Sequence, residues 1–118
     1  SFCPMFAFQD LAAYKKSKQF HMECKKIIQS IPYDKMVVDQ LNRASLSIIL
    51  NIAEGSGKFS NADRKKFFII ARASIFECVA ILDILHDENK IDTSLFKNQL
   101  VISEQISRIL FTMIQNLK

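Results

Sequence analysis

The sequence contains very little glycine and proline, with two residues of each among 118, and it has no tryptophan. A sheet protein of this size needs many turns, and turns draw heavily on glycine and proline. The scarcity therefore argues against a β fold and predicts a few long helices joined by short loops. The length suits a single domain, residues 1–118, with one hydrophobic core. Ten phenylalanines supply large apolar side chains for that core.

Cysteine is also scarce. The chain has three cysteines, an odd number, and no Cys-x-x-Cys motif. Cys24 and Cys78 lie in apolar patterns of helical spacing, where a free thiol usually acts as a small hydrophobe. With Cys3 unpaired as well, no disulfide framework is expected, which favours a cytoplasmic protein. The start, SFCPMFAF, is too short and too irregular for a signal peptide.

Apolar residues recur at helical spacing in four segments, which are separated at three places. Pro32 ends the first segment, and Asp34 and Ser60 are the expected N-caps of the second and third. Gly55 and Gly57 are expected to end the second segment in the left-handed conformation. Matched lengths and short loops predict an all-α, antiparallel up-down-up-down four-helix bundle. The expected helices span about residues 7–30, 35–54, 61–87 and 93–117, with Asp92 or Thr93 capping the last.

The third segment is apolar on nearly all sides. Between Phe67 and Leu85 only Arg72, Ser74, Glu77 and Asp83 interrupt the apolar residues. A membrane span of this length would bury three charges at a cost of about 2.5–3.5 kcal/mol each at the bilayer centre. A surface helix of a monomer should instead show one apolar stripe. We therefore expect a helix covered by its own bundle and by another subunit, hence a homo-oligomer, with a tightly packed monomer as the alternative.

The stretch NIAEGSGK, residues 51–58, ends in Gly-Lys as phosphate-binding loops do. A Walker motif also needs a glycine at position 52 and a hydroxyl at position 59, between a strand and a helix. The chain has Ile52 and Phe59 there, and the preceding segment is helical in pattern. The stretch therefore predicts the end of a helix and no nucleotide site.

Polar residues in the second helix fall at i, i+4, i+8 and i+11, which places them on one face. Charged groups among apolar neighbours are costly unless they are paired. We therefore predict a structural polar seam between the second and third helices, in which Arg43 and Arg72 meet Glu54 and Glu77. No catalytic site is expected. The predicted seam comprises Arg43, Ser47, Asn51, Glu54, Arg72, Ser74 and Glu77.

Basic residues crowd the first helix and the second loop. They are either a solvated surface or, multiplied around the axis of a ring of subunits, a surface for the phosphate backbone of nucleic acid. The net charge of +4 permits the second interpretation without requiring it. His21 and Cys24 have a spacing suited to metal ligands, but two ligands on one helix make no site, so no metal or cofactor is expected. The candidate contacts are Lys15, Lys16, Lys18, Lys25 and Lys26, then Lys58, Arg64, Lys65 and Lys66.

Several of these residues together resemble the bacterial four helix bundle protein family, also called 23S rRNA intervening-sequence proteins. The resemblance covers essentially residues 8–118. It rests on Phe8-x-Asp10-Leu11 with Tyr14-Lys15, on Gln40-Leu41-x-Arg43-Ala44-x-x-Ser47-Ile48, on Asn51-Ile52-Ala53-Glu54-Gly55, and on Phe67, Ala73-Ser74 and Glu77.

The resemblance implies a four-helix bundle that assembles into a ring, commonly a homopentamer, without enzymatic activity. Some relatives are encoded within inserts in ribosomal RNA genes. Another, the accessory variability protein of diversity-generating retroelements, forms a positively charged pentamer that associates with a reverse transcriptase and nucleic acid. Two function classes follow for this chain: a scaffold that binds RNA, DNA or a nucleic-acid enzyme, or a purely structural oligomer. A metal or small-molecule site inside the bundle is the weakest alternative, because no Glu-x-x-His pair is present.

Overall fold

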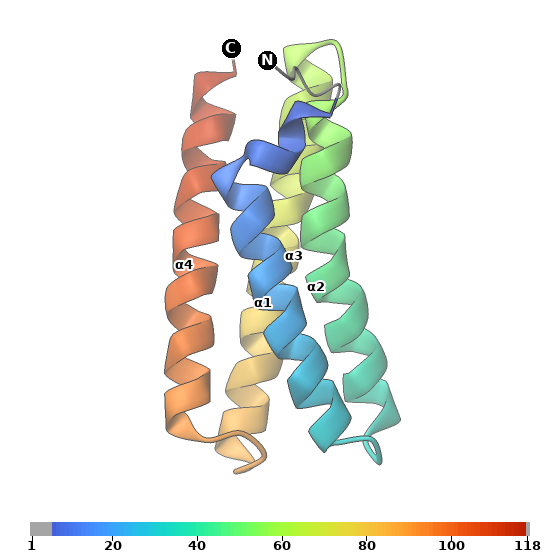
Figure 1. Cartoon of the computed structure of the whole chain (residues 1–118), viewed down its shortest axis with the longest axis vertical. Coiled ribbons are helices and arrows are strands. Elements are labelled where there is room, and N and C mark those ends of the chain that lie inside the picture. Colours follow the sequence, from blue (N-terminus) through green and yellow to red (C-terminus); the bar gives the residue numbers. More distant parts are fainter. Residues whose placement is uncertain (1–5, 118) are drawn as a thin grey trace.

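The computed structural model describes residues 6–117, and all of the regular structure in that range is helical (Figure 1). The predicted all-α fold with four helices is confirmed, and no strand occurs in the described range. A short 3-10 helix precedes the four α-helices. The elements are η1 (Ala7–Asp10), α1 (Ala12–Ser30), α2 (Lys35–Ser56), α3 (Asn61–Asp87) and α4 (Thr93–Asn116).

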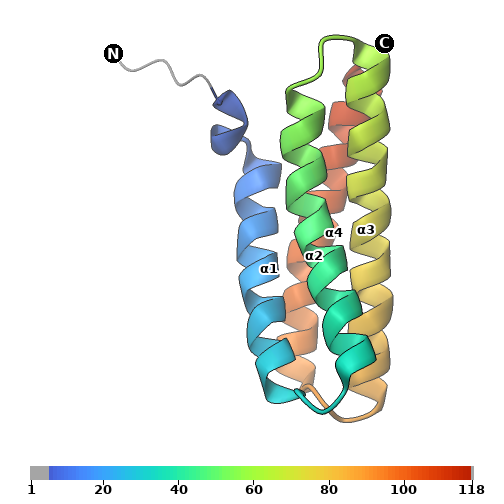
Figure 2. The ribbon, with the colours of Figure 1, turned by 90° about the vertical axis from the view of Figure 1, so that its right-hand side faces the viewer.

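The four helices lie side by side along one long axis, and each runs back along the one before it (Figures 1 and 2). Contacts join α1 to α2, α2 to α3, α3 to α4, and α4 back to α1. The α2–α3 connection and the end of α4 lie at one end of the bundle, which we call the basic end. The α1–α2 and α3–α4 connections lie at the other.

The first helix differs from the expected continuous segment 7–30. Leu11 interrupts it with an extended backbone, φ −67° and ψ 133°, between η1 and α1. This break lets the chain change direction, and η1 stands away from the axis of α1 in Figure 2. The Phe8 ring then meets the Tyr14 ring edge-on, with 5.0 Å between the ring centres. Partly buried Leu11 packs against the core, so tertiary contact prevails over helix continuity here.

The predicted left-handed glycine at the end of α2 is wrong. The helix continues through Gly55 to Ser56, and Gly57 has φ −89° and ψ −4°, an ordinary right-handed conformation. Gly55 is instead required by close packing, because a Cβ there would lie 2.7 Å from Cε1 of Phe68. The absent side chain lets α3 approach α2 closely at the basic end.

The left-handed residue lies at the end of α3, where Asn89 has φ 58°. The backbone N–H of Lys90 donates to the Leu85 carbonyl at 2.9 Å, and that of Asn89 donates to the His86 carbonyl at 3.0 Å. These two bonds form a Schellman motif, in which asparagine replaces the more usual glycine. The carbonyls at the end of α3 are thereby satisfied.

Three helices begin at side-chain caps, as the sequence predicts. The Ser60 hydroxyl accepts from the backbone N–H of Asp63 at 3.1 Å, and the Asp34 carboxylate accepts from Val37 at 3.4 Å. Asp92, rather than Thr93, caps α4, and accepts from the Leu95 N–H at 2.7 Å. Each cap satisfies a backbone donor that has no partner within its helix.

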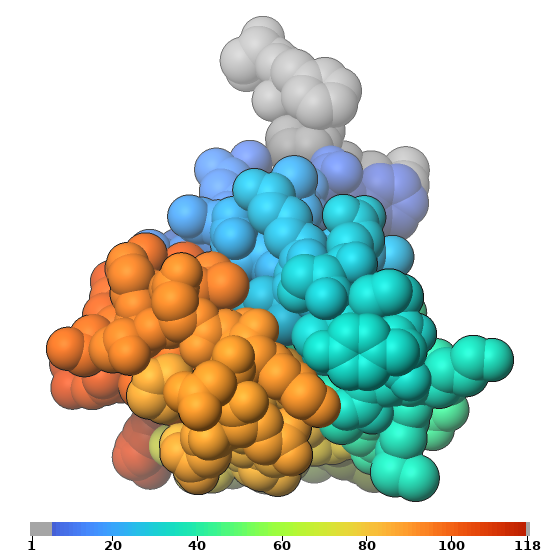
Figure 3. Space-filling model, turned by 90° about the horizontal axis from the view of Figure 1, so that it is seen from below, coloured from blue at the N-terminus to red at the C-terminus, as the bar shows by residue number. Residues whose placement is uncertain are grey.

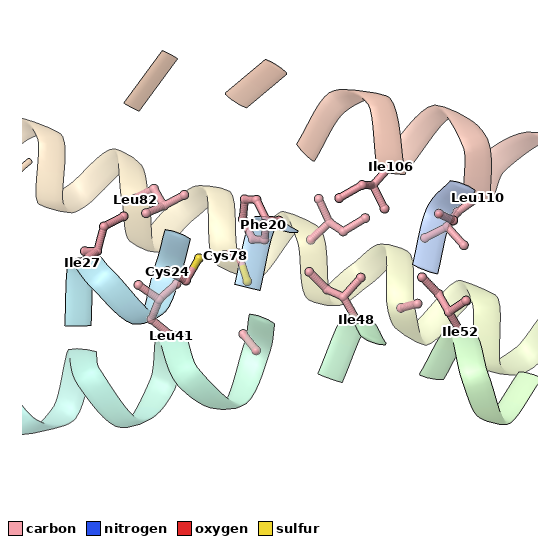
Figure 4. Close-up of a cluster of buried hydrophobic side chains, with 14 of the residues drawn as sticks. Phe20, Cys24, Ile27, Leu41, Ile48, Ile52, Cys78, Leu82, Ile106 and Leu110 are labelled. Atoms are coloured by element: carbon pink, nitrogen blue, oxygen red, sulfur yellow. The ribbon is translucent and has the colours of Figure 1, made fainter. Parts of the chain in front are cut away.

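The core runs the length of the bundle and draws on all four helices (Figure 4). Five polar residues are buried with it, Ser17, Ser45, Ser74, Gln99 and Ser103. Gln99 donates from Nε2 to the Phe20 carbonyl at 3.2 Å, while its Oε1 has no partner among the described residues. An unsatisfied buried acceptor costs about 1–3 kcal/mol. The labelled core residues are Phe20, Cys24, Ile27, Leu41, Ile48, Ile52, Cys78, Leu82, Ile106 and Leu110.

At the end opposite the basic end, the α1–α2 and α3–α4 connections pack together (Figure 3). Lys90 joins them, since its Nζ lies 3.3 Å from Oδ2 of Asp34 and 5.6 Å from the centre of the Tyr33 ring. Its partners Glu88 and Asp34 raise the pKa of Lys90, in that order of effect. This contact fixes the relative height of the two helical hairpins.

The membrane alternative for α3 finds no support in the structure. Across residues 6–117, no helix combines the length and the apolar character that a transmembrane span requires.

Candidate functional site

Three of the seven predicted seam residues meet between α2 and α3. The hydroxyls of Ser47 and Ser74 lie 2.9 Å apart. The Asn51 amide donates from Nδ2 to the carbonyl and to the hydroxyl of Ser47, at 2.8 and 3.0 Å. Ser74 also donates to the Ile70 carbonyl at 3.1 Å. The seam is therefore a neutral network that ties α2 to α3 and contains no charged group.

The predicted ion pairs of the seam are wrong. Arg43 and Glu54 lie on the exposed side of α2, and neither takes part in any ion pair found among residues 6–117. Glu77 is exposed too, and it accepts from Nε2 of Gln40 at 3.0 Å. The ions remain in water because burial would cost each its hydration. The polar side chains of the seam that do meet between the two helices are short hydroxyls and one amide.

Arg72 lies on the opposite flank of α3 from the seam, towards α4. Its guanidinium carbon is 5.3 Å from the centre of the Phe76 ring and 5.5 Å from that of Phe111. Its Nε donates to the Ser107 carbonyl at 3.4 Å. The guanidinium thus lies between two aromatic rings, a cation–π arrangement, and no carboxylate of the described chain pairs with it.

Arg72 and Phe76 also line two open clefts of about 550 and 460 Å³ between α3 and α4. Ile69 and Phe111 line the first of these clefts, and Glu104 and Arg108 line the second. Glu104 and Arg108 form an ion pair with each other. The two clefts therefore make one apolar groove, with Arg72 as its unpaired cation.

The outer face of α3 is apolar, as the sequence pattern indicates. Ile69, Phe76 and Ile84 expose 50%, 60% and 52% of their side-chain surfaces to solvent in the single chain. On the outer side of α2, Leu50 exposes 52% and Leu46 38%. Contiguous apolar residues at such exposure are typical of surfaces that meet another protein.

The basic residues of α1 follow one stripe of that helix. Lys15, Lys18 and Lys25 are exposed, as is Lys26, which pairs with Glu23 at 3.1 Å. Lys16 lies on the flank towards α4 and donates to Gln105 at 3.0 Å. The ammonium of Lys18 lies 5.2 Å from the centre of the Tyr14 ring.

The second basic cluster, at the α2–α3 connection, lies at the same end of the bundle as the start of α1 (Figure 1). The Lys58 ammonium lies 4.9 Å from the centre of the Phe67 ring, and Arg64 donates from Nε to the Lys58 carbonyl at 2.6 Å. Lys65 is half-buried and Lys66 is exposed. The fold thus places the start of α1, with Lys15 and Lys18, at the same end of the bundle as the α2–α3 connection, whereas Lys25 and Lys26 lie towards the other end of α1.

An open cleft of about 810 Å³ also lies at the basic end. Its walls come from η1, α2, α3 and α4, together with Leu11 between η1 and α1. Phe8 and Phe68 give it an apolar lining, and Lys58, Arg64 and Glu54 stand at its edge. Gly57 and Lys58 thus follow a helix and adjoin an apolar cleft, which is not the strand-to-helix setting of a nucleotide-binding loop.

His21 and the described cysteines hold structural positions. His21 Nδ1 lies 2.7 Å from the Ser45 hydroxyl, and partial burial, then nearby Lys25, lowers the pKa of His21. Burial raises the pKa of Cys24 to about 12 and raises that of Cys78 as well. Both thiols therefore remain protonated at neutral pH. Cys3 lies outside the described residues, and within them no three His, Cys, Asp or Glu side chains group as a metal site would need.

Two features of the groove were not predicted from the sequence. Phe76 stands four residues after Arg72, a spacing that places the ring and the cation on one side of a helix. That spacing is visible in the sequence and could have been used. Phe111 lies 39 positions beyond Arg72, and only the packing of α4 on α3 brings its ring to the guanidinium.

Comparison with known families and structures gives two findings. The family model described as 23S rRNA-intervening sequence protein matches residues 9–112. A crystal structure from Bacteroides thetaiotaomicron, described as a protein of unknown function from the S23 ribosomal protein family, is similar with a TM-score of 0.82 and 21% identity. The match covers 89% of this chain and 100% of that one, and at this identity it concerns the fold. A comparison with curated protein sequences finds no match.

Proposed function

The chain belongs to the 23S rRNA-intervening sequence protein family, and from that premise we propose that it is a non-enzymatic, homo-oligomeric scaffold that binds the phosphate backbone of RNA or DNA. The observation that carries this proposal is that the lysines at the start of α1 and the cations of the α2–α3 connection lie at the same end of the bundle. A ring of copies aligned in parallel would repeat that end around its axis. Such a surface attracts phosphate without reading base sequence.

The oligomer part of the proposal rests on the apolar outer faces of α2 and α3. A monomer would expose Phe76, Ile84 and Leu50 to water, and burying each would contribute about 25 cal/mol per Å² of apolar surface. The family resemblance favours a homopentamer. A nucleic-acid enzyme such as a reverse transcriptase is a second partner that the same assembled surface would suit.

The alternative is a structural oligomer without a nucleic-acid role. The specific observation in its favour is that several cations already have partners within the chain, among them Lys16 with Gln105 and Lys26 with Glu23. Among residues 6–117, Lys15, Lys25, Lys65 and Lys66 have no such contact. Of these, Lys15, Lys65 and Lys66 lie towards the basic end, so the proposal depends on these three more than on the rest.

Binding of fluorescently labelled single- and double-stranded RNA and DNA should be measured by anisotropy over a series of salt concentrations. We expect the logarithm of Kd to rise linearly with the logarithm of the salt concentration, because counterions are released from the backbone. Each lysine–phosphate contact that is removed should lower the slope by about one. The variant Lys65→Gln/Lys66→Gln should weaken binding at least tenfold.

The matched control is Lys35→Gln/Lys97→Gln, which removes the same charge from exposed positions of α2 and α4. Both positions lie near the end opposite the basic end. This control should change Kd by less than twofold. Equal weakening by both variants would mean nonspecific charge attraction, and no binding at low salt would favour the purely structural oligomer.

A further inference from the structure

Arg72 and Glu54 take part in no ion pair among residues 6–117, and they adjoin apolar surfaces that face in different directions. Arg72 lies in the groove between α3 and α4, which we define by Ile69, Arg72, Phe76 and Phe111. Glu54 lies on the exposed side of α2, in the same row as Leu46 and Leu50. None of the ion pairs within residues 6–117 includes either residue.

The groove holds its cation without neutralising it. The rings of Phe76 and Phe111 flank the guanidinium, and the Ser107 carbonyl takes only its Nε–H. A guanidinium carries five donors, and it matches a carboxylate in a paired, two-bond geometry. The free edge of Arg72 therefore suits a carboxylate presented by an apolar partner.

The outer side of α2 has that chemistry. Arg43, Leu46, Leu50 and Glu54 follow one another at intervals of three, four and four residues, so they form one ridge along the helix. All four are exposed. Leu50 and Glu54 are one turn apart, about 6 Å, and so are Phe76 and Arg72 in the groove. The two spacings match when the ridge runs antiparallel to α3.

We propose that the α2 ridge of one copy docks in the α3–α4 groove of a second copy, so that Leu50 packs on Phe76 and Glu54 pairs with Arg72 across the subunit boundary. The ion pair that the sequence suggests thereby forms between chains, while within one chain the two residues point in different directions. When two bundles lie side by side in the same orientation, α2 of one copy runs antiparallel to α3 of the other, just as α2 and α3 do within one chain. This is the direction that the pairing of the ridge with the groove requires.

This contact joins two different surfaces, so it is heterologous, and each copy keeps a free ridge and a free groove. Heterologous contacts repeat into a closed ring or an open filament and do not stop at a dimer. The inference therefore rests on the proposed homo-oligomer. It adds which surfaces meet and which residues select the neighbour.

Charge reversal at each side tests the pairing. Glu54→Arg and Arg72→Glu should each weaken self-association at least tenfold in sedimentation equilibrium, because each places like charges together in every contact. A one-to-one mixture of the two variants should regain mixed association to within about threefold of the wild type, a difference of about 0.7 kcal/mol. In the mixture every contact between unlike copies again joins Arg to Glu, so the comparison is made for a single contact. A ring with an odd number of copies cannot alternate the two variants, so the mixture should form open or even-numbered assemblies.

A control variant, Asp10→Arg, makes the same change of charge at an exposed position of η1, outside the ridge and the groove. It should associate as the wild type does. Single variants that assemble normally, or a mixture that does not associate, would overturn the inference while leaving the homo-oligomer intact. A wild-type chain that stays monomeric at high concentration would overturn both.

Arg72→Glu also removes packing from two phenylalanines, so its fold must be checked by circular dichroism. Should it unfold, Leu50→Cys and Phe76→Cys provide the second test, each in a chain carrying Cys3→Ser. Mixed and mildly oxidised, the two variants should form a covalent dimer of unlike chains. The native Cys24 and Cys78 are buried and protonated, and so will not compete. Absence of that dimer would contradict the docking.

Discussion

At the residue scale, Gly55 does not take the left-handed conformation that is usual for glycine at a helix end, whereas Asn89 does. Glycine is the usual left-handed residue at a helix end, yet Gly55 remains helical and its value is the missing Cβ next to Phe68. Asn89 supplies the left-handed turn after α3. The conformation of each residue depends on which side chains of the surrounding fold pack against it, and the local sequence does not give those contacts.

Gly55→Ala should destabilise the fold by about 1 kcal/mol. Alanine gains about 1 kcal/mol in helix propensity, but overpacking against the buried Phe68 ring costs about 1–3 kcal/mol. The control is Gly57→Ala, where the nearest atom, the Glu54 carbonyl oxygen, is 3.6 Å away and φ is negative. That change should raise stability by about 0.4–1 kcal/mol. Urea denaturation measures both, and equal signs would refute the packing role of Gly55.

At the element scale, α2 and α3 are joined by a neutral hydroxyl–amide network and an apolar contact. In the seam, Ser47, Asn51 and Ser74 hydrogen-bond to one another and to the backbone carbonyls of Ser47 and Ile70. The hydrogen bond from Gln40 to Glu77 lies at the exposed margin. Register between the two helices is therefore set by the buried hydroxyls, and the charges predicted for that purpose stay in solvent.

Ser47→Ala should cost about 1–2 kcal/mol in the free energy of unfolding, because Asn51 and Ser74 each lose a partner in a partly buried place. Glu77→Gln should change stability by less than about 0.5 kcal/mol, as exposed substitutions usually do. Thermal and urea unfolding of the two variants provide the measurement. A larger loss of stability from Glu77→Gln than from Ser47→Ala would contradict the neutral network and favour a seam held by charged groups.

At the scale of the whole molecule, the chain is polarised along its length and apolar on one side. Lys58, Arg64, Lys65 and Lys66 gather at one end, and the acidic Asp87, Glu88 and Asp92 lie around the other. The apolar outer faces of α2 and α3 run between the ends. A parallel assembly buries the apolar side and sums the basic ends, which is why the two parts of the proposed function belong together.

The melting temperature of the wild type should rise with protein concentration, since association stabilises only the folded chain. A tenfold increase amounts to about 1.4 kcal/mol per association step, or roughly 3–5 °C for a chain of this size. Phe76→Asp, which places a negative charge on the exposed apolar face of α3, should abolish this dependence and leave the helical content unchanged. Calorimetry at several concentrations checks both, and a constant melting temperature for the wild type would speak against an oligomer.

The sequence by itself determined the helical class, three of the side-chain caps and the apolar excess on α3. These follow from local chemistry: turn residues are scarce, capping oxygens lie next to the N–H groups they satisfy, and apolar periodicity is a property of one segment. The family resemblance likewise rests on contiguous motifs such as Asn51 to Gly55, and the family match agrees with it.

Only the tertiary structure decided where the charged side chains point. The sequence of α3 alone allows Arg72 to face either α2 or α4. In the structure it faces α4, where its guanidinium packs against the Phe111 ring. Likewise, only the folded path of the chain places the lysines at the start of α1 at the same end of the bundle as the α2–α3 cluster. Helix periodicity fixes which residues share a face, but the rotation of one helix against another is set by how their side chains fit together.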